Sequence, residues 1–416
     1  MTGVCGIYAF DEIWDVSRFV YYQMVALQSR GQESFAISTT NFKEVKTAAK
    51  SGLVQQNMAP ADIERLKGFA GAGCIATRDG NTYVADDLAI FFDGSVTITD
   101  EAVAVLREDL ATMPEADAVR RFLDTLEGAY AMVILTTDKM IAARDKRGVK
   151  PLLIGGVGFD LAVIASETAA LDVIGAELSR DIEPGEIVVV DRHYIEEHKD
   201  PRPITPANCI FEYVYMARID SRINDINIHE IRKKIGQLLA LQHPVDADVV
   251  IGVPETAIAF AMAYANEARI PIDIGFMRTG QHLRTAIKPT QIERMIGVQL
   301  KLNPVRSAIR GKRVVLVDDS VVRGTTMRNI VSLLRKRGAK EVHVRIGSPK
   351  LIASCPFGTE VPTQDELIAV DNDEGEIARI IDADTFGYLN LEDLKEALGG
   401  GEFCTGCMSR VYPGLK

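Results

Sequence analysis

The stretch VVLVDDSVVRGTT, residues 314–326, places carboxylates, hydroxyls and a glycine in an order that suits a phosphorylated ligand. Asp318 and Asp319 follow an apolar run typical of a strand buried on both faces. The small residues after them can bring N–H groups and hydroxyls close to a phosphate; they are Ser320, Gly324, Thr325 and Thr326. A helix starting here adds its positive end, and the carboxylates can accept from sugar hydroxyls or help to hold Mg²⁺. The spacing differs from that of a P-loop. The alternative without a functional role is a capped helix that follows a solvent-exposed acidic turn.

Four cysteines in the second half of the chain form another set of residues capable of chemistry. Cys404 and Cys407 make a Cys-x-x-Cys pair, which fits zinc, a redox pair or no ligand at all. Cys209 and Cys355 raise the number to four. Four thiolates suit zinc or an iron–sulfur cluster, and spacing alone does not choose between them.

A fifth cysteine stands in the opening stretch MTGVCGIYAF. Cys5 is either a nucleophile exposed by removal of the four residues before it, or a small buried residue near the start of a strand. Free cysteine is among the most buried residue types, so the second interpretation needs no special context.

Length and composition set the frame for these residues. A chain of 416 residues predicts two domains, and a formal net charge of −11 disfavours a general nucleic-acid binder. The first twenty residues lack the pattern of a signal peptide, and no stretch approaches eighteen apolar residues, so we expect no membrane span and a cytoplasmic protein. In that compartment cysteines serve metal binding or catalysis more often than disulfides.

The first half reads as short strands with helices between them, which predicts an α+β layered domain. The expected strands are Val4–Ala9, Phe35–Thr39, Leu88–Phe92, Ala129–Leu135, Leu161–Ala165 and Glu186–Val190, and the expected helices include Arg18–Gln28 and Asp117–Leu126. Residues 193–209 are polar, contain three prolines and break the periodicity, so we place the junction there, between domains 1–207 and 208–416.

The second half changes to a pattern of parallel strands. Val249–Val253 and Arg313–Val317 are apolar runs, each followed by a helical pattern, and Val342–Ile346 alternates as a further strand. Strand–helix–strand at this spacing is a βαβ unit, so the second domain should hold a parallel sheet with its ligands beyond the carboxyl ends of the strands.

The run 314–326 resembles the phosphoribosyl-pyrophosphate (PRPP) signature of type I phosphoribosyltransferases. More narrowly, the chain resembles the glutamine PRPP amidotransferase family over nearly its whole length. The matching segments are LQSRGQES, ARDKRGVKPLLIG, ASETAALDVIGAE, RDIEPGEIV, ARIDSRIN, KPTQIERMIGVQLKLNPVR and GAKEVHVRIGSP. The resemblance implies an N-terminal-nucleophile (Ntn) hydrolase-like sandwich, the class II glutamine amidotransferase fold, followed by an α/β phosphoribosyltransferase domain.

The resemblance also implies roles for individual residues. Asp318 and Asp319 would bind the ribose hydroxyls and Mg²⁺, with Thr256 joining the metal site. The loop 320–326, with Ser320, Val322, Arg323, Gly324, Thr325 and Thr326, would hold the 5-phosphate. Arg284 would act in the loop that closes over PRPP, where Gln281 and Ala286 replace aromatic residues of the family. Ammonia would then displace pyrophosphate at the anomeric carbon.

The same resemblance selects an iron–sulfur cluster for the four cysteines. One branch of the family carries a [4Fe–4S] cluster on cysteines in the contexts CIFEYVY, SCPFG and FCTGC, and all four positions are filled here, by Cys209, Cys355, Cys404 and Cys407. Its expected role is structural. Cys74 has no such context and is expected in the core.

The glutamine pocket departs from the family pattern. In the family the cysteine of CGI begins the mature chain, attacks the glutamine amide and uses its own α-amino group as base, so Cys5 would require cleavage before it. Arg30 and Gly94 match pocket residues. Ala76 stands where the family has the Arg that binds the glutamine carboxylate, and Asp93 stands where an Asn donates to the oxyanion. The segment that holds the glutamine amino group is missing between residues 96 and 117.

These features predict an enzyme of this family that binds PRPP and Mg²⁺, carries the cluster, and forms phosphoribosylamine from PRPP with ammonia or glutamine, the first step of purine synthesis. Its partners would be PRPP and an amine donor, with no nucleic acid or membrane, and it would assemble as a homo-oligomer. The main alternative is a non-catalytic PRPP-sensing or complex-forming paralogue. A third alternative, a redox protein that only carries the cluster, would not explain the run 314–326.

Overall fold

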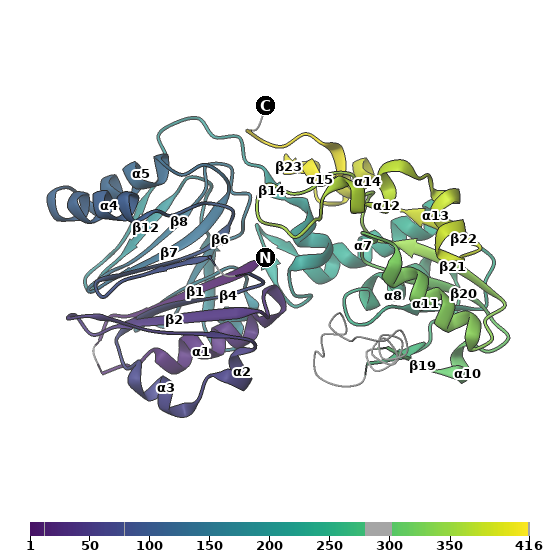
Figure 1. The fold of residues 1–416 in the computed structure, drawn as a ribbon, viewed down its shortest axis with the longest axis horizontal. Coiled ribbons are helices and arrows are strands. Elements are labelled where there is room, and N and C mark those ends of the chain that lie inside the picture. Colours follow the sequence, from purple (N-terminus) through teal and green to yellow (C-terminus); the bar gives the residue numbers. More distant parts are fainter. Residues whose placement is uncertain (12, 79, 279–301, 415–416) are drawn as a thin grey trace.

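The computed structural model describes residues 1–11, 13–78, 80–278 and 302–414, arranged in two lobes (Figure 1). In the first lobe a seven-stranded sheet packs against a six-stranded sheet. The first sheet runs β11 (Glu177–Asp181), β9 (Leu153–Val157), β10 (Leu161–Ala165), β1 (Thr2–Ala9), β4 (Ala70–Ala76), β2 (Ser34–Thr40) and β3 (Val45–Ser51). The second runs β13 (Ile195–His198), β12 (Ile187–Val190), β8 (Met140–Arg144), β7 (Tyr130–Thr136), β6 (Leu88–Gly94) and β5 (Thr82–Val84).

Helices cover the outer faces of both sheets, which makes four layers (Figure 1). On the first sheet lie α1 (Ser17–Ala26), α2 (Val54–Asn57), α3 (Pro60–Arg65) and α6 (Ala169–Asp172), and on the second α4 (Asp100–Thr112) and α5 (Glu115–Asp124). Every residue from 88 to 93 of strand β6 is buried, because one face of this strand packs on the first sheet and the other packs under helices. Ala89 and Phe91 pack with the residues of the first sheet, whereas Ile90 and Phe92 pack under α4 and α5.

The second lobe is built on a four-stranded parallel sheet in the order β17 (Val249–Gly252), β20 (Arg313–Asp318), β21 (Glu341–Ile346) and β22 (Thr385–Tyr388). Its larger helices are α7 (Ile228–Gln242), α8 (Ile258–Ala268), α11 (Thr325–Lys336), α13 (Glu374–Ile381) and α14 (Leu391–Ala397). Shorter elements are the π-helix η2 (Glu212–Met216), α10 (Arg306–Ile309), α12 (Ile368–Asp371), α15 (Gly406–Ser409), and the strand pairs β14 (Asn208–Cys209) with β23 (Phe403–Cys404), β15 (Arg222–Ile223) with β16 (Ile226–Asn227), and β18 (Phe276–Met277) with β19 (Asn303–Pro304). The 3₁₀ turns η1 (Gln28–Arg30) and η3 (Gln364–Glu366) complete the set.

The predicted elements are confirmed, with ends that differ by at most two residues. The βαβ unit 313–346 is parallel as expected, and Gly338 after α11 has a φ of +93°. One part of the junction segment was not foreseen. Residues 195–198 form β13, which pairs with β12, so the first lobe extends further into 193–209 than the polar composition indicated.

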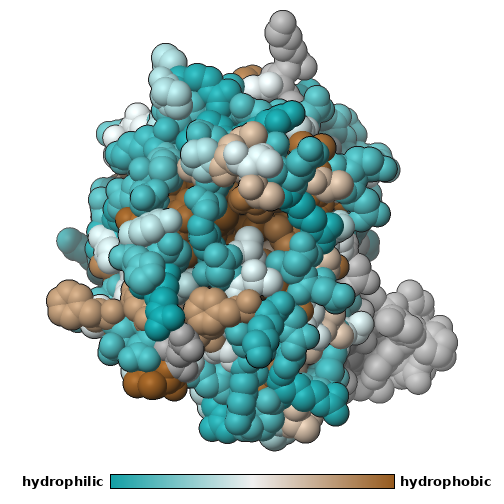
Figure 2. Space-filling view, turned by 90° about the vertical axis from the view of Figure 1, so that its left-hand side faces the viewer, coloured by the Kyte–Doolittle hydropathy of each residue, from teal (hydrophilic) through white to brown (hydrophobic). Residues whose placement is uncertain are grey.

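The surface of the first lobe is mostly polar, with apolar residues visible in a hollow (Figure 2). Within the described ranges, no helix has the length and apolar character needed to cross a bilayer.

The contact between α7 and α8 depends on a glycine. A Cβ atom on Gly236 would lie 2.2 Å from the carbonyl oxygen of Phe260, so Gly236→Ala must push the two helices apart. We expect this variant to lower the thermal unfolding midpoint of the second lobe by about 4–8 °C, followed by circular dichroism. Gly375→Ala in α13 is the matched control, because a Cβ there meets only Asp373 at 3.4 Å. An unchanged midpoint for Gly236→Ala would show that the helices do not pack as described.

Candidate functional site

The acidic pair lies at the carboxyl end of β20, where the parallel strands of the second lobe end. The backbone N–H of Asp319 donates to Asp318 Oδ1 at 2.9 Å, and Ser320 Oγ donates to Asp319 Oδ1 at 2.8 Å. The hydroxyl of Thr256, in the turn after β17, also hydrogen-bonds to Asp319, and Arg232 faces that carboxylate. Burial raises the pKa of both carboxyl groups. The structure thus brings together the three residues predicted for Mg²⁺, and their role stays a prediction.

The loop after the acidic pair is held in one shape by its neighbours. Gly324 precedes α11 with a φ of +75°, a conformation that favours glycine, and a Cβ there would lie 2.5 Å from Ile368 Cδ1. The carbonyl of Val322 accepts from the N–H of Ile368 at 2.9 Å, and Arg323 forms an ion pair with Glu366. Residues 318–327 line a cavity of about 340 Å³. N–H groups and hydroxyls around this cavity can receive an anionic ligand.

Arg284, predicted to act in the closing loop, lies outside the described residues, as do Gln281 and Ala286. Arg278, just before that segment, forms an ion pair with Glu255 at 3.5 Å.

A second cavity, of about 460 Å³, adjoins the first. Met1 and Tyr215 line both cavities, and Thr256 and Arg232 line the second. The second cavity therefore reaches from the boundary between the lobes to the expected metal site.

The four cysteines predicted to bind a cluster converge at the boundary between the lobes, although they come from distant parts of the chain. Cys209 and Cys404 are directly opposite each other in the parallel pair β14–β23. The N–H groups of Ile352 and Ala353 donate to the carbonyl of Cys407, which anchors the segment that carries Cys355. All four thiols are free, and three of them are buried.

The donor set fits an iron–sulfur cluster. Burial and the neighbouring thiols raise the pKa of Cys209 and Cys407, and burial raises that of Cys404 to about 11. Such thiols are ionised only with a compensating cationic centre. In the described part of the chain, no three His, Cys, Asp or Glu side chains are arranged around a single metal ion. Four cysteine thiolates are the usual ligands of a [4Fe–4S] cluster, and that cluster stays a prediction here.

Cys5 lies in the middle of β1, paired with Ala165 on one side and Gly73 on the other. Its side chain is fully buried, Sγ lies 3.6 Å from the carbonyl oxygen of Gly73, and burial raises its pKa. The thiolate is the nucleophilic form, so Cys5 as it lies here is a core residue, the second of its two predicted settings. Its catalytic role stays a prediction that requires cleavage within β1. Cys74 is buried in β4, as expected.

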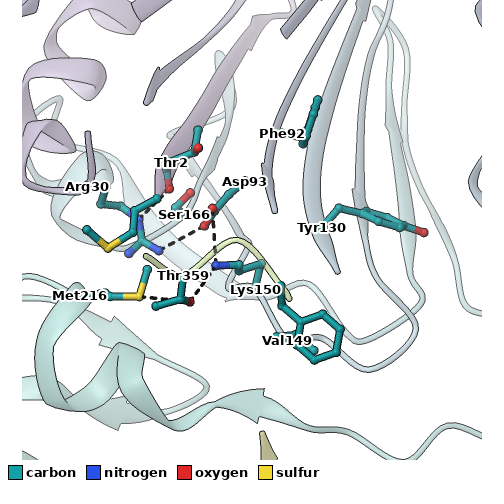
Figure 3. Close-up of polar contacts among 12 residues, drawn as sticks. Thr2, Arg30, Phe92, Asp93, Tyr130, Val149, Lys150, Ser166, Met216 and Thr359 are labelled. Carbon is teal, nitrogen blue, oxygen red and sulfur yellow. Dashed lines mark hydrogen bonds and ion pairs between the residues drawn. The ribbon is translucent and has the colours of Figure 1, made fainter. Parts of the chain in front are cut away.

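Thr2 is the first residue of β1, and three residues discussed for the glutamine pocket, Ala76, Arg30 and Asp93, lie near it. Ala76 pairs with Thr2 across β1 and β4. Arg30 Nε donates to the carbonyl oxygen of Thr2 at 3.1 Å, and Arg30 also reaches Asp93 (Figure 3). Cys5, three residues further along β1, pairs instead with Ala165 and Gly73.

A set of five buried charged side chains, called the buried ionic cluster below, fills the space beside Thr2. Its members are Arg30, Asp93, Lys150, Glu167 and Glu212. Arg30 donates to Glu212 through both Nη atoms (3.0 and 2.8 Å), to Glu167 at 3.2 Å and to Asp93 at 3.4 Å. Lys150 Nζ lies 3.7 Å from Asp93 Oδ1 (Figure 3). Arg30 is therefore committed to protein carboxylates, and its predicted contact with glutamine stays a prediction.

Sequence reasoning missed Lys150, Glu167 and Glu212. Each lies in a segment that matched the family, and Glu212 is the one charged residue in the stretch CIFEYVYM, a signal that could have identified it.

Gly94 has a packing role in the structure. Its φ is +146°, and a Cβ there would lie 1.9 Å from the carbonyl oxygen of Ala129. A Cβ on Gly358 of the second lobe would in turn lie 2.6 Å from the carbonyl oxygen of Gly94, so the two backbones touch where the lobes meet. The stretch that lacks the family's segment folds as α4.

Comparisons with known proteins agree with this architecture. A family model described as a glutamine amidotransferase domain matches residues 95–173, and one described as a phosphoribosyl transferase domain matches residues 222–346. The fold and the site thus define a class II glutamine amidotransferase domain joined to a phosphoribosyltransferase domain.

Full-length relatives narrow the class to one family. The chain is 38% identical to the amidophosphoribosyltransferase of Methanocaldococcus jannaschii, covering 99% of this chain and 98% of the relative, and 36% identical to that of Bacillus subtilis. The structure of glutamine PRPP amidotransferase from B. subtilis, complexed with ADP and GMP, superposes with a TM-score of 0.91 at 34% identity, covering 99% of this chain and 97% of that one. The chain belongs to the amidophosphoribosyltransferase family, and these comparisons give no support to a non-catalytic paralogue.

The burial of Cys5 leads to a labelling prediction. Under native conditions we expect Cys5 and Cys74 to resist alkylation equally, because both thiols are buried and have raised pKa values. After denaturation both should react, as peptide mass spectrometry would show. Preferential native labelling of Cys5 over Cys74 would contradict its place in the core.

Proposed function

We propose that this enzyme transfers the phosphoribosyl group of PRPP to ammonia taken from solution, forming phosphoribosylamine and pyrophosphate in the first step of purine synthesis. Membership of the family supports the reaction. The choice of ammonia rests on one observation: the carboxylates and phosphate loop of the second lobe face an open cavity, whereas Arg30, the arginine predicted to contact glutamine, is engaged by protein carboxylates.

The second lobe supplies the groups that this reaction needs. N–H groups and hydroxyls of residues 320–326 would hold the 5-phosphate at the start of α11. Asp318, Asp319 and Thr256 fit Mg²⁺, since they place hard oxygen ligands together at the edge of the sheet. When bound, the metal would neutralise charge on the departing pyrophosphate. The burial that raises the pKa of both carboxyl groups also makes a cation there favourable.

The first lobe lacks three features that glutamine use requires. Ala76 cannot bind the α-carboxylate of glutamine, a contact worth a few kcal/mol when made by Arg, on the order of other charge-assisted hydrogen bonds. Asp93 only accepts hydrogen bonds when ionised and would repel an oxyanion. The thiol of Cys5 is enclosed in the sheet. Each change weakens binding or chemistry, so glutamine hydrolysis should be lost.

The donor test compares ammonium salt with glutamine in parallel. We expect anaerobically purified protein with PRPP and Mg²⁺ to release pyrophosphate with ammonium salt and to show only background release with glutamine. Equal rates with glutamine would overturn the ammonia proposal and mean that other residues of the first lobe bind glutamine. Bound PRPP with no release from either donor would overturn the reaction itself.

A matched pair of variants tests the acidic pair in the same assay. Asp319→Asn should lower kcat/KM about 100-fold, which corresponds to about 3 kcal/mol of lost transition-state stabilisation. Asp160→Asn, at an exposed position of the first lobe, should leave the rate unchanged.

We also propose that Cys209, Cys355, Cys404 and Cys407 hold a [4Fe–4S] cluster with a structural role. It would tie the segments around β14, β23 and Cys355 together where the lobes meet. The chain would work as a homo-oligomer, as its family members do.

The cluster has its own test. Anaerobic protein should contain iron and sulfide in equal amounts with broad visible absorbance, and Cys355→Ser should lose both. Cys74→Ala, a cysteine outside the set, should retain them. A fully loaded Cys355→Ser variant would contradict this ligand assignment.

A further inference from the structure

Lys150 is a fully buried lysine of the first lobe that reaches the boundary between the lobes. Its Nζ atom forms an ion pair with Asp93 Oδ1 at 3.7 Å, which is longer than a hydrogen bond, and donates to the hydroxyl of Thr359 at 3.5 Å (Figure 3). An ammonium carries several N–H donors, and the contact with Thr359 is the one hydrogen bond that Lys150 donates within the described residues. Its other donors are available to a further anionic group beside it.

The backbone next to Lys150 is bound to the segment that carries the first cysteine of the set. The N–H of Cys209 donates to the carbonyl of Val149 at 3.0 Å. Cys209 in turn stands directly opposite Cys404 in the parallel pair β14–β23. Two of the four cysteines are thus fixed next to the loop that carries Lys150.

The hydroxyl that Lys150 contacts belongs to the segment of a third cysteine. Cys355 and Thr359 lie in one short stretch, in which Cys355 Sγ accepts from the N–H of Phe357 at 3.4 Å. The side chain of Lys150 therefore crosses from the first lobe to the second and ends beside the segment of Cys355.

The ammonium also acts on the thiols themselves. Among the described residues, Lys150 is the cation with the strongest electrostatic influence on Cys209 and Cys404. Burial lowers the pKa of Lys150, but Asp93 and the neighbouring thiols raise it, so that its pKa lies above the ordinary value and the side chain stays charged. The fold thus places a permanent cation close to the cysteine set.

Two further neighbours of these thiols are acids. Glu212 acts on Cys209, and Asp145 acts on Cys404, and each raises the pKa of the thiol near it. An iron–sulfur cluster held by four thiolates carries net negative charge, to which these acids add. Burying this charge is unfavourable unless a cation accompanies it.

We propose that the ammonium of Lys150 is the counter-ion of the iron–sulfur cluster on Cys209, Cys355, Cys404 and Cys407. The inference rests on the proposed cluster and adds to it a residue of the other lobe, since all four ligands belong to the second lobe. Lys150 is a positioning residue in this role, because it would act on the thiolates and the cluster and not on PRPP. Outer groups of this kind fix the ligands of a metal site and tune its reduction potential.

A purely structural role for Lys150 is the competing interpretation. Its side chain joins Asp93 of the first lobe to Thr359 of the second, and this bridge by itself would help to hold the lobes together. The two interpretations differ in a measurable property. A bridge affects the stability of the protein, whereas a counter-ion also changes the reduction potential of the cluster.

The test removes the ammonium without stranding the carboxylate beside it. Asp93→Asn/Lys150→Met is compared with Asp93→Asn, because Lys150→Met alone would leave the carboxylate of Asp93 without this cation. Both full-length proteins are purified anaerobically, and the release of iron to a chelator is followed by absorbance. We expect the double variant to release iron about 10-fold faster, since outer groups contribute about 10–100-fold to metal affinity.

Lys146→Met is the surface control. Lys146 lies in the same loop as Lys150, but it is exposed and pairs with Asp124 at 2.6 Å. This variant should release iron at the rate of the wild-type protein.

A redox titration of the loaded proteins decides between counter-ion and bridge. Loss of a cation beside the cluster makes its reduction less favourable, so the midpoint potential of the double variant should lie below that of Asp93→Asn. An unchanged midpoint would assign Lys150 to the bridge and overturn the proposal, even if iron release is faster. Wild-type protein without iron and sulfide would overturn the cluster itself, a result distinct from a loaded wild type whose variants behave alike.

Discussion

The pair formed by Arg30 and Glu212 is the interaction on which the two-lobe structure depends. Arg30 belongs to the first lobe and Glu212 begins the π-helix η2 of the second, and both Nη atoms of the arginine contact the carboxylate. Glu167 of the first lobe also contacts the second lobe, because its carboxylate accepts hydrogen bonds from the N–H of Arg218 and from Ser221 Oγ. Buried ion pairs stabilise little by themselves, but removing one partner leaves a stranded charge, so the lobes are fixed in one arrangement.

That arrangement also brings the first lobe against the phosphate-loop cavity of the second lobe. Its N-terminal residue lines the cavity of the phosphate loop, and residues near Gly94 touch the segment of the second lobe that contains Cys355 and Glu360. The same segment supplies Thr359 beside Lys150.

The sequence was informative where a function depends on one continuous segment. Strand, acidic pair, loop and helix follow one another in residues 313–336, so their local geometry could be predicted together, and Thr256 could be added because it follows the neighbouring parallel strand. The position of Cys5 could not be settled in this way. Alternation along a strand is the same for every register, so the motif Cys-Gly-Ile did not say which residue stands at the head of β1. The partners of Arg30 are separated from it by 63 to 182 residues, and charge pairing at that distance is decided only by the packed fold.

The protein buries carboxylates in two places, beside Thr2 and at the end of β20, and the two groups differ in how their negative charge is balanced. Burying carboxylates is unfavourable unless positive charge accompanies them. Beside Thr2 the carboxylates of Asp93, Glu167 and Glu212 are buried together with two cations of the protein itself, Arg30 and Lys150. At the end of β20, Arg232 lies near Asp319, and Asp318 and Asp319 face a cavity. The second group therefore keeps negative charge that a bound cation could balance, and this difference in charge compensation distinguishes the two lobes.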